Sequence, residues 1–262
     1  MYTAGIDIGS TTTKAVLFNG TRILASSVMP SGIAPAETAV KVLDTVLAEA
    51  KMTKDQLSSI ASTGYGRRLT DLSDKVVTEI KACAAGAVFM GTPDGKPNTV
   101  VDIGGQDTKV IQLGEDGQVT NFVMNDKCAA GTGRFLEVLA MKLEMSYNDF
   151  VKAALESTTP IQMNSTCAVF AESEVISLLA RGIKKSDIAA AAHASIANRV
   201  GAMLRRLDAQ NPPYLFVGGG ALNAAMLKSL EDNVGIKLYS HEYAQRAIAL
   251  GAAVIAQEEN KE

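Results

Sequence analysis

The chain has 262 residues, of which 47% are hydrophobic, and this length suffices for one large domain or two small ones. Its net charge of −3 argues against nucleic-acid binding, and no apolar run reaches the roughly 18–20 residues that span a membrane. Three Cys and two His argue against a disulfide framework and a His-rich metal site. No basic-then-apolar leader is present, so we expect a cytoplasmic location.

The N-terminal segment predicts a strand, a tight turn and a second strand. Apolar residues 2–6 lead into Asp7-Ile-Gly-Ser-Thr-Thr-Thr-Lys14, and residues 15–17 resume the apolar alternation. Glycine lets a backbone approach a phosphate closely, and hydroxyls and successive backbone N–H groups can donate to it. An Asp at the end of the first strand can hold a metal ion through water.

The rest of the first half alternates predicted helices and strands. Val40, Leu43, Val46 and Leu47 recur at helical spacing in a predicted helix over 36–50. Thr53 is a candidate N-cap of a short helix that ends near residue 58. The other expected elements are strands at 22–28 and 60–63, a glycine-rich loop at 64–68, a buried helix at 74–90 and a hinge at 92–98.

The second half opens with a copy of the first turn. Asp102-Ile-Gly-Gly-Gln-Asp-Thr-Lys109 repeats the pattern at an offset of 102 − 7 = 95, and Val28-Met29 recurs as Val123-Met124 at the same offset. Two copies in register indicate two related half-molecules. Beyond a return strand at 119–124 the copies diverge. The later expected elements are strands at 214–217 and 236–239, and helices at 134–143, 147–156, 169–181, 186–208 with Ser186 as its cap, 224–230 and 242–257.

A third glycine-rich turn, Gly218-Gly-Gly-Ala-Leu-Asn223, ends a predicted strand and opens a helix. A lone glycine turn more often marks a plain tight turn, but three of them, two built around an Asp, predict binding of nucleotide phosphates. The third turn suits an adenosine or phosphate contact at a helix N-terminus. The sequence contains neither a Walker A loop nor a Gly-x-Gly-x-x-Gly fingerprint after its first strand.

Two cysteines stand where a helix is expected to begin. Cys128 follows Asn-Asp-Lys and Cys167 follows Asn-Ser-Thr, and the N-terminus of a helix favours a thiolate. The alternative is that each is a small buried hydrophobe, which is the interpretation we adopt for Cys83 in its apolar helix. A cubane cluster usually needs about four thiolates, and a two-fold dimer would supply 2 × 2 = 4.

The duplicated Asp-Ile-Gly turns and the late Gly-Gly-Gly resemble the actin, Hsp70 and sugar-kinase superfamily. That resemblance implies an α/β chain of two duplicated actin-like (ribonuclease H-like) domains with mixed sheets and a cleft between them for ATP or ADP and Mg²⁺. The domains would be residues 1–96 plus 243–262, and residues 97–242. In the catalytic centre, Asp7 and Asp102 would orient Mg²⁺ and water, together with Gln106. The implied nucleotide contacts are Gly9, Ser10, Thr11, Thr12, Thr13, Lys14, Gly104, Gly105, Gln106, Asp107, Gly218, Gly219, Gly220, Asn223 and, with less in common, Gln245.

The two cysteine segments, residues 125–135 and 165–175, narrow the resemblance. They look like the activators of 2-hydroxyacyl-CoA dehydratases and the ATPase subunits of benzoyl-CoA reductases, and the likeness runs from Ile6 to Ala253. It implies a homodimer in which Cys128 and Cys167 of both protomers ligate one [4Fe–4S] cluster. The chain would then be an ATP-driven one-electron donor that takes its electron from ferredoxin or flavodoxin and passes it to a CoA-ester dehydratase or reductase.

Other interpretations remain open at this stage. A small-molecule kinase of the same superfamily would phosphorylate a sugar or acid without iron. An Hsp70-like, ATP-gated interaction module would carry the cysteines incidentally. The electron acceptor could also be another low-potential cluster reductase. Residues 131–133, Gly-Thr-Gly, fit either a flexible link between the second turn and the next helix or a plain irregularity at the helix start.

Overall fold

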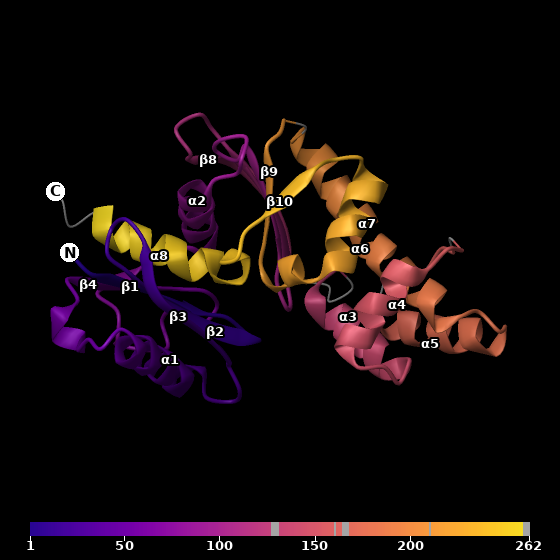
Figure 1. The fold of residues 1–262 in the computed structure, drawn as a ribbon, viewed down its shortest axis with the longest axis horizontal. Helices are drawn as coiled ribbons and strands as arrows, with labels where there is room; N and C mark the ends of the chain where they lie inside the picture. The colour runs from indigo at the N-terminus through magenta and orange to yellow at the C-terminus, as the bar shows by residue number, and fades with distance from the viewer. Residues whose placement is uncertain (127–130, 160, 164–167, 210, 259–262) are drawn as a thin grey trace. The chain divides into compact units, whose positions relative to one another are not determined.

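The fold was analysed in a computed structural model, which describes residues 1–126, 131–159, 161–163, 168–209 and 211–258 (Figure 1). The chain divides into two compact units. The first contains residues 1–98, 113–120 and 241–262, and the second contains residues 99–112 and 121–240. No helix in the described part of the chain is long and apolar enough to cross a membrane.

The first unit is built on a five-stranded mixed sheet in the order β3-β2-β1-β4-β5. The hairpin β1–β2 and the pair β2–β3 are antiparallel, whereas β4 runs parallel to both β1 and β5. Its strands are β1 (Thr3–Ile8), β2 (Thr12–Phe18), β3 (Ile23–Pro30), β4 (Ser59–Thr63) and β5 (Lys75–Val76).

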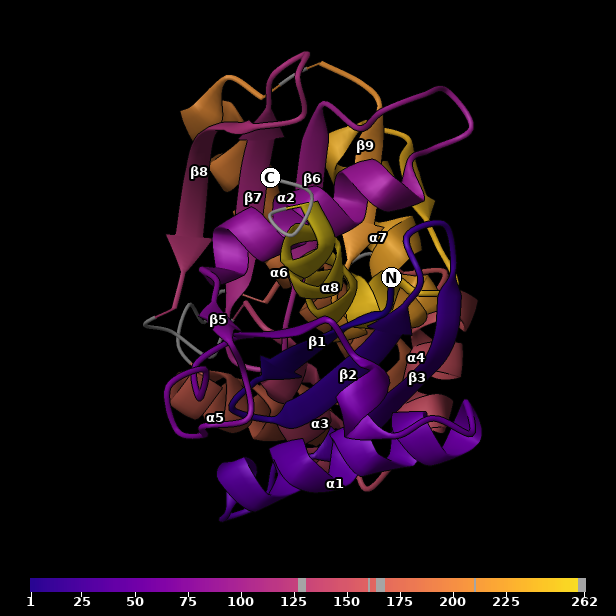
Figure 2. The same cartoon turned by 90° about the vertical axis from the view of Figure 1, so that its left-hand side faces the viewer.

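Two helices cover opposite faces of this sheet, as Figure 2 shows. Alternate strand residues such as Ile6 and Leu17 pack against α1 (Pro35–Glu49), while Val16 and Phe18 on the other face pack against α8 (Ala247–Glu258). The helix α2 (Glu79–Met90) packs against α8 at glycines, and its N-cap is Thr78, whose hydroxyl accepts the Lys81 N–H. Two short 3-10 segments complete the unit, η1 (Lys54–Gln56) and η3 (Ala244–Arg246).

The second unit repeats the same sheet plan, in the order β8-β7-β6-β9-β10. Its central hairpin β6–β7 is antiparallel and β9 runs parallel to β6 and β10, as in the first unit. The duplicated mixed sheets predicted from the sequence are therefore confirmed. The strands are β6 (Thr99–Ile103), β7 (Thr108–Leu113), β8 (Val119–Asn125), β9 (Tyr214–Val217) and β10 (Leu238–Ser240).

The helices inserted into the second half form one large core with the second sheet. Strand residues Val101, Ile103 and Val110 pack with apolar side chains from these helices, and Phe135, Phe150 and Ile196 are fully or almost fully buried in it. The helices are α3 (Gly133–Lys142), α4 (Tyr147–Glu156), α5 (Ala168–Ala180), α6 (Lys185–Leu207) and α7 (Ala224–Val234), with the 3-10 segment η2 (Gly219–Leu222) before α7.

Several local predictions were wrong. The helix expected over 74–90 begins only at Glu79, because residues 75–76 add the edge strand β5 to the first sheet. Ser186 does not cap α6, since Lys184 holds the N-cap position and Ser186 lies inside the first turn. Val40 is 40% exposed, and Ala39 takes the buried place on α1. The closing helix begins at Ala247 rather than at residue 242.

Candidate functional site

The first predicted phosphate turn links β1 to β2, and its Asp and Lys are cross-strand partners. Asp7 pairs with Lys14 in the β1–β2 register, so the two side chains project from the same face of the hairpin. Lys14 Nζ lies 2.8 Å from Asp7 Oδ2, and the Lys14 and Asp7 side chains are 15% and 4% exposed. Between them, the Thr11 hydroxyl is buried and has no partner among the described atoms, and Ser10 is exposed at the tip.

The second turn repeats this arrangement, and its Asp and Lys side chains are less exposed to solvent. Asp102 pairs with Lys109 in the β6–β7 register, and Lys109 Nζ lies 3.1 Å from Asp102 Oδ2 and 2.8 Å from Asp107 Oδ2. The Lys109 and Asp102 side chains are both only 1% exposed. Gln106 is exposed at the tip of the turn. The second turn therefore presents an amide outward above a buried charge network.

A glycine stands beside the carboxylate in each turn. A Cβ on Gly64, directly after β4, would lie 2.5 Å from Asp7 Oδ1, and a Cβ on Gly218, directly after β9, would lie 2.3 Å from Asp102 Oδ1. Both glycines have positive φ, 86° and 84°, which L side chains rarely adopt. Gly218 was predicted as a nucleotide contact from the sequence, but Gly64 was predicted only as part of a glycine-rich loop. The structure identifies it as the counterpart of Gly218.

Asp102 offers an oxygen suited to a metal-bound water. Its Oδ1 atom is buried and has no hydrogen-bond partner among the described atoms. Buried carboxylate oxygens are normally satisfied, and a hydrated Mg²⁺ is a hard cation that such an oxygen suits. No group of three or more His, Cys, Asp or Glu in the described residues is placed to hold a metal ion by itself. The unpartnered Asp102 Oδ1 fits a Mg²⁺ ion that is held through water, as proteins commonly hold this ion.

The third predicted turn lies next to the second one. Because β9 runs parallel to β6, with Val217 opposite Asp102, Gly218 to Gly220 follow the same sheet edge as the second turn. Asn223 ends this turn and caps α7, since its Oδ1 accepts the Met226 N–H at 2.9 Å. The tertiary structure thus brings two of the three predicted turns together within one unit. Gln245 lies in the first unit, in η3, where it is partly buried.

The Asn223 side chain also belongs to a buried polar network. Asn223 Nδ2 donates to the Tyr147 hydroxyl and lies 3.0 Å from His193 Nε2, and His193 Nδ1 lies 2.7 Å from the Ala189 carbonyl oxygen. These contacts require a neutral ring with its proton on Nδ1. Burial lowers the pKa of His193, and burial likewise raises the pKa of Tyr147. With its amide committed inside the protein, Asn223 positions the third turn and leaves mainly backbone groups there for a ligand.

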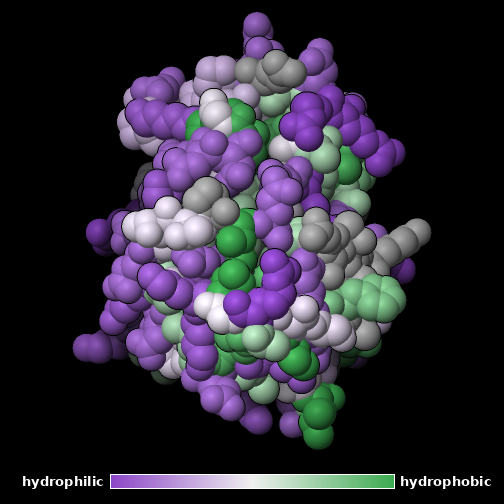
Figure 3. Space-filling model, turned by 90° about the vertical axis from the view of Figure 1, so that its right-hand side faces the viewer, coloured by the Kyte–Doolittle hydropathy of each residue, from purple (hydrophilic) through white to green (hydrophobic). Residues whose placement is uncertain are grey.

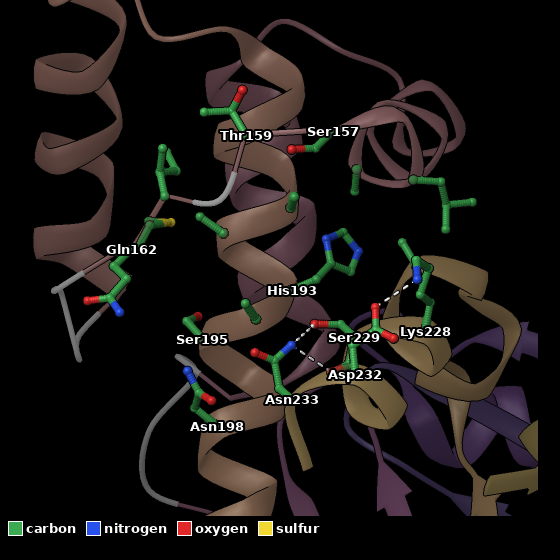
Figure 4. Close-up of a pocket in the computed structure, with 18 of the residues that line it drawn as sticks. Ser157, Thr159, Gln162, His193, Ser195, Asn198, Lys228, Ser229, Asp232 and Asn233 are labelled. Atoms are coloured by element: carbon green, nitrogen blue, oxygen red, sulfur yellow. Dashed lines mark hydrogen bonds and ion pairs between the residues drawn. The ribbon is translucent and has the colours of Figure 1, made fainter. Parts of the chain in front are cut away.

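The second unit also contains an open cavity of about 550 Å³, shown in Figure 4. It lies between α6, α7 and the chain after α4, and His193, Ser195 and Asn198 line one side of it. Among its described lining residues, Lys228 and Asp232 form an ion pair of 2.7 Å with each other. The cavity therefore offers little net charge to a phosphate, and the described lining contains none of the residues of the three turns.

The predicted cluster ligands Cys128 and Cys167 lie outside the described residues. In sequence, Cys167 directly precedes the first residue of α5, and Cys128 stands five residues before the start of α3. Cys83 lies on α2 and is fully buried, as expected from its apolar surroundings.

Comparison with known proteins identifies the family. The BadF/BadG/BcrA/BcrD ATPase family matches residues 4–256. The "(R)-2-hydroxyglutaryl-CoA dehydratase activating ATPase" of Acidaminococcus fermentans is 42% identical over 260 residues, which cover 98% of this chain and 97% of the relative. The crystal structure of component A of this dehydratase superposes with a TM-score of 0.94 at 40% identity, over 100% of both chains.

A second similar structure was determined with a bound nucleotide analogue. The activator of the 2-hydroxyisocaproyl-CoA dehydratase from Clostridium difficile, determined with bound ADPNP, gives a TM-score of 0.92 at 37% identity and covers 100% of this chain and 96% of that one. A ROK family glucokinase from Streptomyces griseus shares the fold alone, with a TM-score of 0.60 at 14% identity over 98% of this chain and 100% of the glucokinase. The duplicated sheets, the paired Asp–Lys turns and these full-length matches agree: the chain belongs to the BadF/BadG/BcrA/BcrD ATPase family.

Proposed function

We propose that this protein is an ATP-hydrolysing one-electron donor that activates a 2-hydroxyacyl-CoA dehydratase or a related CoA-ester reductase. The observation that carries the proposal is the pair of equivalent Asp–Lys turns in a chain that matches dehydratase activators over its whole length. One of the subunits of the benzoyl-CoA reductase from Thauera aromatica, 30% identical over 262 residues, extends the range of CoA esters to be considered.

In this proposal both turns take part in nucleotide binding. Residues 9–14 and 104–107 contact its phosphates, Asp7 and Asp102 hold Mg²⁺ through water, and Gln106 orients the attacking water. The backbone of Gly218 to Asn223, together with Gln245, holds the adenosine. The orphaned Asp102 Oδ1 and the exposed amide at the tip of the second turn support these roles. Hydrolysis then depends on positioning and on stabilising charge on the phosphoryl oxygens, as in other phosphoryl transfer.

The proposed electron carrier is a [4Fe–4S] cluster held by Cys128 and Cys167 of both subunits of a homodimer. With Cys83 buried on α2, the chemistry of the donor set leaves two candidate thiols per chain, and two chains supply the four that a cubane usually takes. When bound, the cluster would supply a low-potential electron, taken from ferredoxin or flavodoxin. Domain closure on ATP would couple hydrolysis to electron delivery.

The described surface of the second unit supports a protein partner. Met141 on α3 and Phe170 and Ile176 on α5 are 72%, 69% and 61% exposed, and the two helices contact each other. Figure 3 views the side on which Figure 1 draws α4 and α5, and it shows apolar residues gathered in patches between hydrophilic ones. Large exposed apolar side chains on neighbouring helices are a feature of many interaction surfaces. A second copy of the chain or a dehydratase would bury them.

Anaerobic purification tests the cluster. We expect about four Fe per dimer, with absorbance near 400 nm, and loss of both in Cys128→Ala and in Cys167→Ala, while Cys83→Ala retains them. The loaded protein, ATP and a chemical reductant should activate a purified 2-hydroxyacyl-CoA dehydratase. Iron-free protein that activates its partner fully would contradict the electron-donor proposal, and ATP-dependent phosphorylation of a sugar or acid would support a kinase instead.

A second experiment tests the nucleotide site. Asp102→Asn keeps the size of the side chain but removes its charge, so we expect kcat for ATP hydrolysis to fall about 100-fold. Asp232→Asn on the exposed face of α7 is the control and should hydrolyse ATP like the parent protein. An unchanged rate in Asp102→Asn would exclude this carboxylate from catalysis.

A further inference from the structure

The start of α3 is hydrogen-bonded directly to the second phosphate turn. The Gly133 N–H donates to the Gly104 carbonyl oxygen at 2.9 Å, and the Arg134 N–H donates to the Gly105 carbonyl oxygen at 3.0 Å. The Thr108 hydroxyl, at the other end of the turn, donates to the Gly131 carbonyl oxygen. We call residues 131–134 the clamp. The first N–H groups of a helix have no partner within it, and here the turn supplies partners for two of them.

The clamp is tightly packed. A Cβ on Gly133 would lie 3.2 Å from the Gly104 carbonyl oxygen, and a Cβ on Gly131 would lie 3.0 Å from Asn125 Nδ2 and 3.3 Å from Arg199 Cδ. Thr108 and Thr132 are 1% and 0% exposed. The Gly-Thr-Gly sequence at 131–133 is therefore a closely fitted backbone contact. This excludes the interpretation of these residues as a loose link.

The planar peptide group determines which side of the second turn its free-facing N–H groups lie on. The peptides 104–105 and 105–106 direct their C=O groups to α3, and in a planar trans peptide the N–H points the opposite way. The N–H groups of Gly105 and Gln106 therefore lie on the side of the turn away from α3. A phosphate that accepts from these N–H groups therefore acts on the same rigid peptides whose C=O groups hold α3.

We infer that the clamp couples the nucleotide state of the second turn to Cys128, with Thr108 and Gly133 as positioning residues. Cys128 is three residues before the clamp in sequence. The inference rests on the proposed function, since it assigns phosphate to the second turn and a cluster to Cys128. It adds the residues through which the phosphate at the second turn acts on the cluster ligand Cys128.

The first unit provides an internal control. There the Ser31 hydroxyl donates to the Gly9 carbonyl oxygen at 2.6 Å and lies 2.9 Å from the Thr13 hydroxyl. Gly9 and Thr13 are the equivalents of Gly104 and Thr108 at the offset of 95. The same atoms of the two turns are thus tied down by the chain that follows the third strand. Only in the second unit does that chain follow a candidate cluster cysteine.

The test compares Thr108→Val with Ser31→Ala and Thr108→Ser in the full-length protein purified without oxygen. The electron paramagnetic resonance spectrum of the reduced cluster is recorded with ADP and with ADPNP. We expect the two nucleotides to give different spectra in the parent protein, Ser31→Ala and Thr108→Ser, and a smaller difference in Thr108→Val, where the backbone bonds of Gly133 and Arg134 to the turn remain. ADPNP should bind Thr108→Val within about threefold of the parent affinity, which is a change of less than 1 kcal/mol.

A second readout does not need the cluster. In iron-depleted protein, the rate of Cys128 alkylation by iodoacetamide is followed by peptide mass spectrometry with and without ADPNP. The nucleotide should change this rate in the parent and in Ser31→Ala, and by a smaller factor in Thr108→Val and in Gly133→Ala. A full nucleotide effect in Thr108→Val, or an equal loss in Ser31→Ala, overturns the inference. Iron-free parent protein overturns the proposed electron donor instead, and the alkylation rates still decide whether the clamp couples.

Discussion

The two Asp–Lys turns share one backbone plan and differ in their side chains. In the first, the three residues of the tip are Ser10, Thr11 and Thr12, and Lys14 keeps 15% of its side chain exposed. In the second, the tip is Gly105, Gln106 and Asp107, and Lys109 is buried between two carboxylates. The two copies therefore keep the hairpin and its Asp–Lys pair, whereas their tips differ. The first tip offers hydroxyl donors, and the second offers an amide above a buried charge network.

The largest difference should appear when the lysines are replaced. Lys109→Met leaves the buried Asp102 without its cation and should cost about 3–5 kcal/mol of unfolding free energy. Lys14→Met should cost about 1–2 kcal/mol, because water reaches Lys14 and screens the charge that remains. Denaturant unfolding of both variants, followed by segment-resolved hydrogen exchange, measures the difference. An equal loss of unfolding free energy in the two variants would show that the deeper burial of Lys109 does not strengthen its contribution to stability.

The glycines beside the carboxylates should respond alike. Gly64→Ala and Gly218→Ala each force a side chain into a positive-φ position and against an aspartate oxygen, so each should cost about 3 kcal/mol. Both variants should also lose nucleotide affinity, measured by isothermal titration with ADP. Gly32→Ala is a control with positive φ and open space around it, and it should cost about 1 kcal/mol. A loss of stability in Gly64→Ala no larger than that in Gly32→Ala would mean that the Asp7 carboxylate has room to move.

One substitution removes the side-chain contacts that Ser31 makes with the first turn, although the Ser31 N–H still donates to the Thr11 carbonyl oxygen at 3.0 Å. The backbone bonds that hold the second turn cannot be removed in this way. Ser31→Ala leaves the Gly9 carbonyl oxygen and the Thr13 hydroxyl without their partner and should cost about 1–3 kcal/mol. Because Ser31 is 1% exposed, water would reach these groups poorly. Thermal unfolding measures the loss, and Ser31→Thr, which keeps the hydroxyl, should recover part of it. Stability unchanged in Ser31→Ala would show that the first turn holds its shape without this tie.

The smallest expected effect is a pH dependence confined to the second unit. Burial lowers the pKa of His193 in the folded protein, so the unfolded chain binds a proton more readily. Stability is then fully present above the unfolded pKa of about 6.5 and falls as the pH drops through it, by about 1 kcal/mol between pH 7.5 and 5.5. Urea unfolding at both values, in the parent protein and in His193→Gln, measures it. A pH dependence that His193→Gln retains would assign it to other groups.

The sequence alone predicted the two related halves because identical residues recur at a constant offset of 95. It missed the equivalence of Gly64 and Gly218, whose offset is 218 − 64 = 154. The helices α3 to α6 are inserted between the turn and β9 in the second half, so the register of the repeat is lost there. Ser31 was missed for a related reason, since one serine after a strand carries no pattern of its own.

The local sequence pattern also gave the wrong solvent exposure for two side chains. Lys109 stands next to a polar turn, which suggests that water reaches it, yet it is 1% exposed. Val40 continues a helical apolar spacing, yet the face of α1 that meets the sheet passes through Ala39 instead. Burial depends on what packs against an element, and that information lies far away in the chain.

By itself, the sequence determined the duplicated strand–turn–strand motif, the third glycine-rich turn and the family resemblance, because each is written in consecutive residues. The tertiary structure alone decided which side chains face the carboxylates and which backbone groups tie the turns to their neighbours. Pairing across a hairpin sets Lys14 on Asp7 and Lys109 on Asp102, and the parallel strand beside each hairpin brings its glycine to the same carboxylate. These contacts arise only when strands distant in the chain share one sheet.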